Sequence, residues 1–303
     1  MDFPLVNELP LPFPDRARWP WIEAGVMLPY LKPEGTPWPR ISIVTSSFNQ
    51  GEYLEETLRS VLLQGYPNLE YLVLDGGSKD NSPEIIEKYS PFLSYWHSRR
   101  DEGQSDAINQ GLRMATGDIV AWINSDDYYL PRVFERIVKL FDGQDIQVIY
   151  GRAFFIDEEG KIIEEYPAGP LHLDWRRFRY WRGWPIPQPT VFMRRNLLEQ
   201  FGYLDTSLHY AMDYDLLIRL SCHVKLNFLD TPIANYRIHR DSKTGDWVES
   251  QELFFREDLR VNRKYAPWYL PENWRLWLEW LMHVLMRHLK KALRPLVKWW
   301  RNG

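Results

Sequence analysis

The sequence has almost no cysteine, little excess charge of either sign and no long apolar run. Its single cysteine, Cys222, excludes an internal disulfide framework and a metal site built from several cysteines, and it suits a reducing cytosol. The net charge of -4 argues against a protein that coats nucleic acid. No run of about 18 apolar residues occurs, so we expect no membrane-spanning helix. The N-terminus lacks the basic and apolar regions of a secretory signal, and we therefore expect a cytoplasmic protein.

The 303 residues divide into three regions of different composition. Residues 1–40 are crowded with prolines and aromatic side chains, which excludes a long helix or a central strand because proline fixes φ and lacks a backbone donor. We expect an extended arm packed over the main domain by its tryptophans, with a separate recognition element as the alternative. Residues 41–240 form the expected main domain, with halves at 41–130 and 131–240. Residues 241–303 are expected to be a helical C-terminal region.

Segments typical of strands and of helices alternate in the first half of the main domain. The run "ISIVTS" precedes the helix-period segment "GEYLEETLRSVLLQG", and "LEYLVLDGG" and "DIVAWI" are further strands with short helices between them. This alternation predicts an α/β fold with a mostly parallel sheet covered on both faces. The second half is less regular, although "QVIYG" and "PTVFMRR" resemble strands and "MDYDLLIRLSC" resembles a helix.

Polar residues gather where three of the predicted strands end. The clusters are Ser46-Ser47-Phe48-Asn49, Asp75-Gly76-Gly77-Ser78 and Asn124-Ser125-Asp126-Asp127. In an open α/β sheet these ends share one edge, where a ligand crevice forms. Burying two adjacent carboxylates is costly unless their charge is compensated. Hard divalent cations prefer oxygen ligands and commonly bridge protein carboxylates to substrate phosphates, so the two aspartates predict a metal site.

A nucleoside-diphosphate sugar has chemical needs that these clusters meet. Asp75 can accept hydrogen bonds from the edge of a base, and the glycines beside it let the backbone approach a ligand closely. Phe48 offers a flat apolar contact. A cation at Asp126 would stabilise the charge that develops on a departing diphosphate. The clusters therefore favour a nucleotide-sugar site.

Taken in order, several segments resemble the family 2 glycosyltransferases. They are "ISIVTSSFNQGEYLEETLRSVL", "LEYLVLDGGSKDNS", "DEGQSDAINQGLRMATGDIVAWINSDDYYLP", "QPTVFMRRNLL" and "MDYDLLIRL". The resemblance covers about residues 40–240 and implies the GT-A fold, an inverting reaction and a nucleotide-sugar donor, with a UDP-sugar expected. It makes 41–130 the nucleotide-binding half and 131–240 the acceptor half.

The resemblance also implies roles for individual residues. The expected donor contacts are Thr45, Ser46, Phe48, Asp75, Asp106, Asn109, Asn124 and Ser125. The last acid of the family's D-x-D motif falls on Asp126, the expected ligand of Mn²⁺ or Mg²⁺, with Asp127 beside it. His239, in "YRIHRDSKT", is expected to approach the metal or the diphosphate. Asp213 is the expected general base, which deprotonates an acceptor hydroxyl.

Three residues depart from the family's pattern. Asn124 replaces the first acid of D-x-D, which lowers the local negative charge. Gly76 stands where many relatives carry a second Asp. Met212 replaces the Glu that usually precedes the base. These departures make a catalytically weak or inactive nucleotide-sugar binding or membrane-recruitment module the main alternative function.

Other interpretations stay open for single residues. Asp126 or Asp127 can be a helix cap or a turn residue before "PRVFERIVKLF", and Asp75 can be a turn residue. Asp213 can simply be a first-turn acid that the helix dipole favours, and His239 can be a structural histidine. Gln188, in "IPQPT", is expected to face the acceptor, with an ordinary loop amide as the alternative. A nucleotidyltransferase is a further alternative, but "TSSFNQGEY" lacks the basic residues that it would need after the first strand.

The tail from Pro271 onward is basic on one side of a predicted helix. It carries seven Lys or Arg and two Glu, so its net charge is about +5. At roughly 100° per residue, the basic residues at 287, 290, 291, 294, 298 and 301 fall within a sector of about 100°, opposite apolar side chains. We expect this helix to lie on an anionic cytoplasmic leaflet, as a peripheral membrane anchor suited to a glycan or lipid-linked acceptor. A helix packed on the domain is the alternative.

Overall fold

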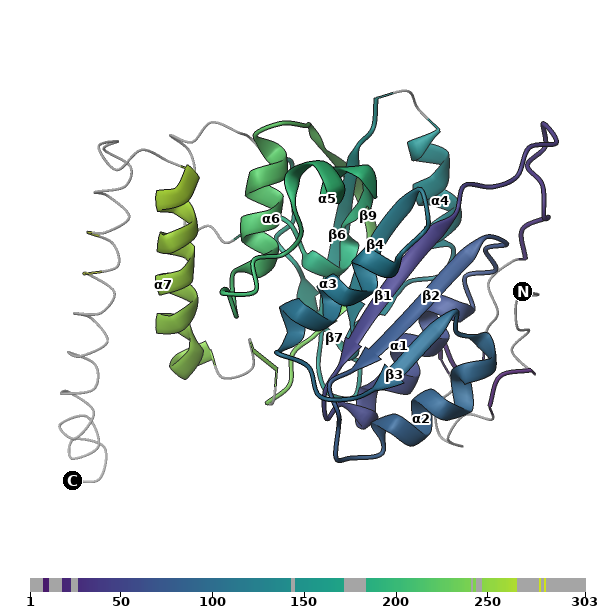
Figure 1. Cartoon of the computed structure of the whole chain (residues 1–303), viewed down its shortest axis with the longest axis horizontal. Coiled ribbons are helices and arrows are strands. Elements are labelled where there is room, and N and C mark those ends of the chain that lie inside the picture. The colour runs from purple at the N-terminus through teal and green to yellow at the C-terminus, as the bar shows by residue number, and fades with distance from the viewer. Residues whose placement is uncertain are drawn as a thin grey trace.

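The computed structural model describes residues 8–10, 18–22, 27–142, 145–171, 184–240, 242–243, 247–265, 278 and 281. Strands and helices alternate through the first half, as Figure 1 shows. The first half contains β1 (Ile41–Ser47), α1 (Gly51–Leu62), β2 (Leu69–Asp75), α2 (Ser82–Tyr89), η1 (Ser90–Phe92), β3 (Tyr95–Ser98), α3 (Gln104–Met114), β4 (Ile119–Asn124) and β5 (Tyr128–Tyr129). The second half contains α4 (Val133–Phe141), β6 (Val148–Ile156), β7 (Ile162–Glu165), η4 (Gln188–Thr190), β8 (Phe192–Arg194), α5 (Asn196–Phe201), α6 (Met212–Ser221), β9 (Leu226–Arg237) and α7 (Trp247–Tyr265).

One mixed sheet joins the two halves. Its strands lie in the order β3-β2-β1-β4-β8-β6-β9-β5, and β7 pairs with β6. The first four strands of the chain are parallel, whereas β8 runs antiparallel to both of its neighbours. The register pairs Ser47 with Asp75 and Ser46 with Asn124, so the three polar strand ends lie at one edge. The predicted α/β fold with a mostly parallel sheet is confirmed.

Two apolar cores cover the two faces of the sheet. One core joins Ile41 and Ile43 of β1 to α1, α2 and α4. The other joins Val44 of β1 to α3, α5 and α6. Close approach of α3 to β1 requires Gly111, because a Cβ there would lie 2.4 Å from a methyl carbon of Val44. Burial of both faces explains why the central strands are apolar throughout rather than alternating.

The described parts of the N-terminal arm pack against the first core. Trp21 and Trp38 are buried, and the indole N–H of Trp19 donates to the Tyr129 carbonyl at 2.8 Å. The fully buried Arg59 of α1 donates to the carbonyl groups of Pro20 and Trp21. The backbone carbonyl groups of the arm therefore stabilise the buried positive charge of Arg59.

The C-terminal helix α7 stands beside α6 at the edge of the molecule (Figure 1). The Tyr214 hydroxyl donates to the Asn262 side chain at 2.8 Å, and Lys264 and Tyr265 both reach Asp215. No helix within the described ranges has the length and apolar character needed to cross a membrane. The predicted basic tail helix lies outside the described residues, apart from positions 278 and 281.

Candidate active site

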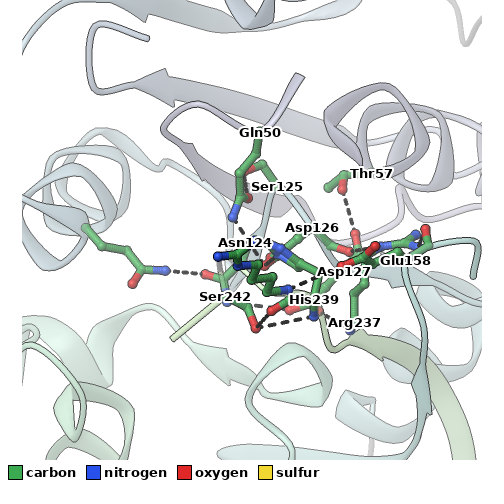
Figure 2. A network of polar contacts seen from close by, with 12 residues as sticks. Gln50, Thr57, Asn124, Ser125, Asp126, Asp127, Glu158, Arg237, His239 and Ser242 are labelled. Carbon is green, nitrogen blue, oxygen red and sulfur yellow. Dashed lines mark hydrogen bonds and ion pairs between the residues drawn. The ribbon is translucent and has the colours of Figure 1, made fainter. Parts of the chain in front are cut away.

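Asp126 is the second residue after β4. One of its carboxylate oxygens has hydrogen-bond partners and the other has none among the described residues. Its Oδ2 accepts from Gln50 at 3.3 Å and lies 3.0 Å from Nε2 of His239. Its Oδ1 is buried and has no hydrogen-bond partner among the residues that the structure describes. Figure 2 shows the labelled side chains of Gln50 and His239 beside the carboxylate of Asp126. An unpartnered buried carboxylate oxygen is costly, and it is a site for a cation or a donor from a ligand.

The donor set around Asp126 fits a divalent cation that is shared with a substrate. Within the described ranges, no group of three or more His, Cys, Asp or Glu side chains is placed to hold a metal by itself. Mg²⁺ is commonly bound through one or two carboxylates together with substrate phosphates. Asp126 and the adjacent imidazole of His239 match that incomplete set, so the phosphates of a ligand would complete it.

Asp127 is turned away from the open side of the cluster. Its Oδ1 accepts the backbone N–H of Arg237 at 2.9 Å, and its own carbonyl accepts the Thr57 hydroxyl at 2.6 Å. Burial, together with the charge of Asp126, raises the pKa of Asp127 well above its usual range. Its side chain does not cap α4, whose first N–H bonds Gln64 instead. Asp127 therefore holds β9 beside β4 in this structure, and its assignment as a metal ligand stays a prediction.

Arg237 compensates the negative charge beneath the two aspartates. It is 1% exposed and donates to the Asp126 carbonyl at 2.9 Å and to the carboxylate of Glu56 on α1 at 2.5 Å. Its guanidinium also lies 4.7 Å from the centre of the Tyr53 ring, which in turn packs at 4.7 Å against His239. This buried arginine fixes the orientation of the strand end that carries His239.

Amide side chains form the other wall of the cluster. The Asn124 amide accepts from Gln104 at 2.8 Å and donates to Gln188 at 3.3 Å. Gln188 itself donates to the Trp122 carbonyl at 2.9 Å, and the Ser125 hydroxyl donates to Gln50 at 2.5 Å. Asn124 also donates to Oδ2 of Asp127 at 3.5 Å, a contact between an amide and a carboxylate that a second acid at position 124 could not make in its ionised form. Gln188 lies against the strand-end cluster, although its predicted contact with an acceptor remains a prediction.

The predicted nucleoside contacts differ widely in accessibility. Asp75 is fully buried, and its carboxylate accepts four hydrogen bonds from Gly77, Ser78 and Ser98. Phe48 is 61% exposed, while the Thr45 hydroxyl is buried against Tyr71 at 3.0 Å. Asp75 thus shapes the loop in which Gly77 adopts φ of +81°, and to read a base it would have to exchange one of these bonds.

A second carboxylate near Phe48 was not identified from the sequence. A Cβ at Gly76 would lie 2.8 Å from Oδ2 of Asp101 and 3.2 Å from the Phe48 ring. An aspartate at position 76 would therefore face the negative charge of Asp101. The buried hydroxyl of Ser46 has no partner among the described residues, so this part of the strand-end edge keeps unused polar groups.

The two predicted donor contacts on α3 have separate surroundings. Asp106 is half-buried and accepts from Gln110 at 2.8 Å within its own helix. Asn109 is 1% exposed, and its amide bonds both the N–H and the carbonyl of Leu204. In this structure Asn109 ties α3 to the segment before α6, and its role as a donor contact stays a prediction.

Asp213 lies in the first turn of α6 and is partly exposed. Loss of hydration raises the pKa of Asp213, whereas a hydrogen bond from the Tyr214 N–H at 2.8 Å and the charge of Lys243 lower it. Burial also lowers the pKa of Lys243 to about 8, against the pull of Asp213, Glu257 and Asp126. The charges of the strand-end aspartate and of the predicted base both act on the pKa of Lys243, and the role of Asp213 as the base stays a prediction.

Met212, the residue before the predicted base, points into the core. Its side chain is 6% exposed, and its sulfur accepts from the Ser105 hydroxyl at 2.7 Å. A glutamate at this position would be buried against α3. The substitution therefore removes an acid without opening the site.

Comparisons with known proteins identify the family and the fold of this chain. The model for glycosyl transferase family 2 matches residues 42–202. An uncharacterized glycosyltransferase of Methanocaldococcus jannaschii is 24% identical over 75% of this chain and 80% of its own length. Another, from Nostoc sp., is 29% identical over 66% of this chain and 65% of its own length.

Two solved structures share the fold. S. aureus TarS 1-349 in complex with UDP-GlcNAc superposes with a TM-score of 0.60, at 20% identity, over 77% of this chain and 68% of that one. The mannosyltransferase PcManGT from Pyrobaculum calidifontis in complex with GDP-Man and Mn²⁺ superposes with a TM-score of 0.56, at 18% identity, over 90% of this chain and 86% of that one. These similarities confirm the predicted GT-A architecture.

Proposed function

Because this chain belongs to glycosyl transferase family 2, and is thus a nucleotide-sugar-dependent glycosyltransferase, we propose that it transfers its sugar with inversion to a hydroxyl of a glycan or lipid-linked acceptor. The observation that carries the proposal is the carboxylate of Asp126, whose buried Oδ1 has no hydrogen-bond partner among the described residues while Nε2 of His239 lies 3.0 Å from its Oδ2. A direct displacement needs a group that handles the leaving diphosphate and a base for the acceptor at one site.

In the proposed reaction, Asp213 takes the proton from the acceptor hydroxyl as that oxygen attacks the anomeric carbon. Asp126 and His239 would hold Mn²⁺ or Mg²⁺ together with the donor's diphosphate. When bound, the cation supplies charge stabilisation to the leaving group. Asp213 must be ionised to act, and the positive charge of Lys243 favours that state.

We propose a UDP-sugar as the donor. Phe48 exposes a ring on which a base can stack, and the carboxylates of Asp75 and Asp101 lie beside the same loop. A carboxylate accepts the ring N–H that uracil presents. The neighbours in fold were solved with UDP-GlcNAc in one case and with GDP-Man and Mn²⁺ in the other, so the test needs donors with different bases.

The experiment is a transfer and hydrolysis assay on purified full-length protein. UDP-, GDP- and dTDP-sugars are incubated with Mn²⁺, Mg²⁺ or a chelator, and released nucleoside diphosphate is measured. We expect one donor to be consumed, only with metal, and turnover to be lost in Asp126→Ala and Asp213→Asn. The anomeric configuration of the product, read by NMR, must be opposite to that of the donor.

A binding module is the second candidate, favoured by Asn124 and Met212 in place of acids. It predicts donor binding by calorimetry without release of nucleoside diphosphate, including with lipid-linked acceptors. Turnover that survives Asp213→Asn would instead exclude Asp213 as the base while leaving the activity in place.

A further inference from the structure

A single carboxylate on α7 binds the segment that leads into α6. Oε2 of Glu257 accepts the backbone N–H groups of Tyr210 at 2.6 Å, Ala211 at 2.9 Å and His209 at 3.0 Å. Its Oε1 accepts the His209 N–H again, at 2.9 Å. Three consecutive amides thus point at one side chain that lies 46 to 48 residues further along the chain.

These amides lie at the entrance to α6: those of His209 and Tyr210 precede the helix, and that of Ala211 is at its N-cap position. The first N–H groups of a helix have no partner inside it, and they carry the positive end of the helix dipole. Ala211, the residue before α6, provides no side-chain cap. Glu257 therefore binds the turn that leads into α6, including the N-cap amide of Ala211, and its negative charge suits the positive potential at the helix N-terminus.

A cation holds the same segment from its other side. Nζ of Lys243 donates to the carbonyl of His209, and this lysine lowers the pKa of Asp213. The segment 209–211 is thus bound through its donors by Glu257 and through an acceptor by Lys243. Asp213 follows two residues later, in the first turn of α6.

We propose that Glu257 is a positioning residue for the base of the transfer reaction. By fixing the amides of 209–211, it sets the position of the first turn of α6 and so the direction in which the Asp213 side chain points. This inference rests on the proposed role of Asp213. It assigns to α7, which lies beyond the family match at 42–202, a direct part in the geometry of the active site. Glu257 itself touches no reacting atom.

Four variants of the full-length chain test the inference: Glu257→Ala, Glu257→Gln, Glu252→Ala and Asp213→Asn. Glu252 is the matched control, because it lies on the same helix, is exposed, and pairs with Arg256 in α7 itself. Glutamine keeps an oxygen that can accept the amides but loses the charge. Amide hydrogen exchange of 205–215 and steady-state kinetics with the preferred donor are measured for each variant.

We expect faster exchange at 209–211 in Glu257→Ala and a kcat lowered about 10- to 100-fold, with the donor KM within about twofold, because a small displacement of a reacting group costs that much. Glu257→Gln should recover most of the protection and most of the kcat. Glu252→Ala should match the wild type in both. Since a loss of folding would speed exchange everywhere, faster exchange confined to 209–211 separates local release from unfolding.

The outcomes separate this inference from the proposed function. Unchanged exchange in Glu257→Ala, or released amides with an unchanged kcat, would overturn the positioning role even if Asp213→Asn is inactive. If the wild-type protein consumes no donor at all, the proposed reaction fails, and the exchange data then decide alone whether Glu257 holds the segment. A donor KM that rises by the same factor as kcat falls would also overturn the positioning role, because the donor site would then be disturbed.

Discussion

Phe48 carries a large apolar ring with 61% of its surface in contact with solvent, at the end of β1. Little stability is lost if such a ring is removed, whereas stacking of a base on an aromatic ring is worth about 1–3 kcal/mol. We therefore expect Phe48→Ala to weaken UDP binding about 5- to 150-fold, measured by calorimetry, with an unchanged Tm. Phe48→Trp should retain binding. Ile162→Ala, which removes another exposed apolar side chain, is the control.

If Phe48→Ala binds UDP as the wild type does, the base lies elsewhere along the strand-end edge. Asp101→Asn then tests the neighbouring carboxylate without changing the size of the side chain. A loss of UDP binding in that variant alone would locate base recognition in a hydrogen bond rather than in stacking.

The pH dependence of the reaction follows from the charge of Lys243. Burial raises the pKa of Asp213, and Lys243 opposes that rise. A base is active when ionised, so kcat/KM should increase with pH through the pKa of Asp213. Lys243→Met removes the opposing charge, which should move this acidic limb to higher pH and lower kcat/KM below it. The measurement is the pH profile of kcat/KM for the wild type and the variant.

Lys243→Arg keeps the positive charge and should leave the acidic limb where it is. Because the pKa of Lys243 is lowered to about 8, the wild-type lysine loses its charge above that pH. The pH profiles of the wild type and of Lys243→Met should therefore approach each other there. An unshifted limb in Lys243→Met would mean that Asp213 is not the group that titrates.

At this scale, the sequence located the acids but not their partners. Asn124, Asp126 and Asp75 end predicted strands, and strand ends can be recognised from a local pattern. Gln50 and Arg237 contact Asp126 across 76 and 111 residues of chain, and nothing local marks them. Asp75, predicted to be a free acceptor for a base, instead accepts hydrogen bonds from its own loop and from Ser98 of β3, and only the folded structure brings Ser98 there.

Among the elements, the α6–α7 pair shows how the C-terminal region is attached. Asp215 of α6 is fully buried and accepts from Lys264 at 2.9 Å and Tyr265 at 3.0 Å on α7, and it pairs with Arg219 at 3.2 Å. Removing one member of a buried charge network leaves the other charges uncompensated. We expect Asp215→Ala to lower the free energy of unfolding by about 2–4 kcal/mol, measured by urea denaturation.

Glu199→Ala is the control for that measurement. Glu199 forms an exposed pair with Arg195 four residues away on α5, and such pairs contribute about 0–1 kcal/mol. Equal destabilisation by the two substitutions would mean that α7 does not depend on Asp215 for its attachment.

The elements were easier to predict than their contacts. The period of "MDYDLLIRLSC" predicted α6 with acids in its first turn, and the alternating pattern predicted the parallel strands. The attachment of α7 was not predicted, because its partners Tyr214 and Asp215 in α6 lie about 50 residues away and no local pattern marks them as contacts of another helix. The proposed boundary at residue 240 separates α7 in sequence from a helix that it contacts directly.

At the scale of the whole molecule, the proposed active site draws on three segments of the chain. In the proposed site, residues 41–130 provide Asp126, residues 131–240 provide Asp213, and the region after residue 240 provides Lys243 and Glu257. The family match stops at residue 202, before the predicted base. A site assembled in this way depends on how the segments pack. The sequence therefore predicted the location of the site better than the complete set of residues that form it.

The basic tail bears on where the molecule works. Residues 271–303 carry a net charge of about +5, and an anionic surface contributes about 1 kcal/mol for each nearby basic residue. We propose that this tail binds the cytoplasmic leaflet and brings the active site to a lipid-linked acceptor. Full-length protein should float with vesicles containing phosphatidylglycerol, but not with neutral vesicles, and less at high salt. Replacing Lys290, Lys291 and Arg294 by Gln should weaken partition about 100-fold. Replacing Lys79, Lys88 and Lys139 on the main domain should change it little, whereas an equal loss in both variants would mean that total charge, not the tail, governs binding.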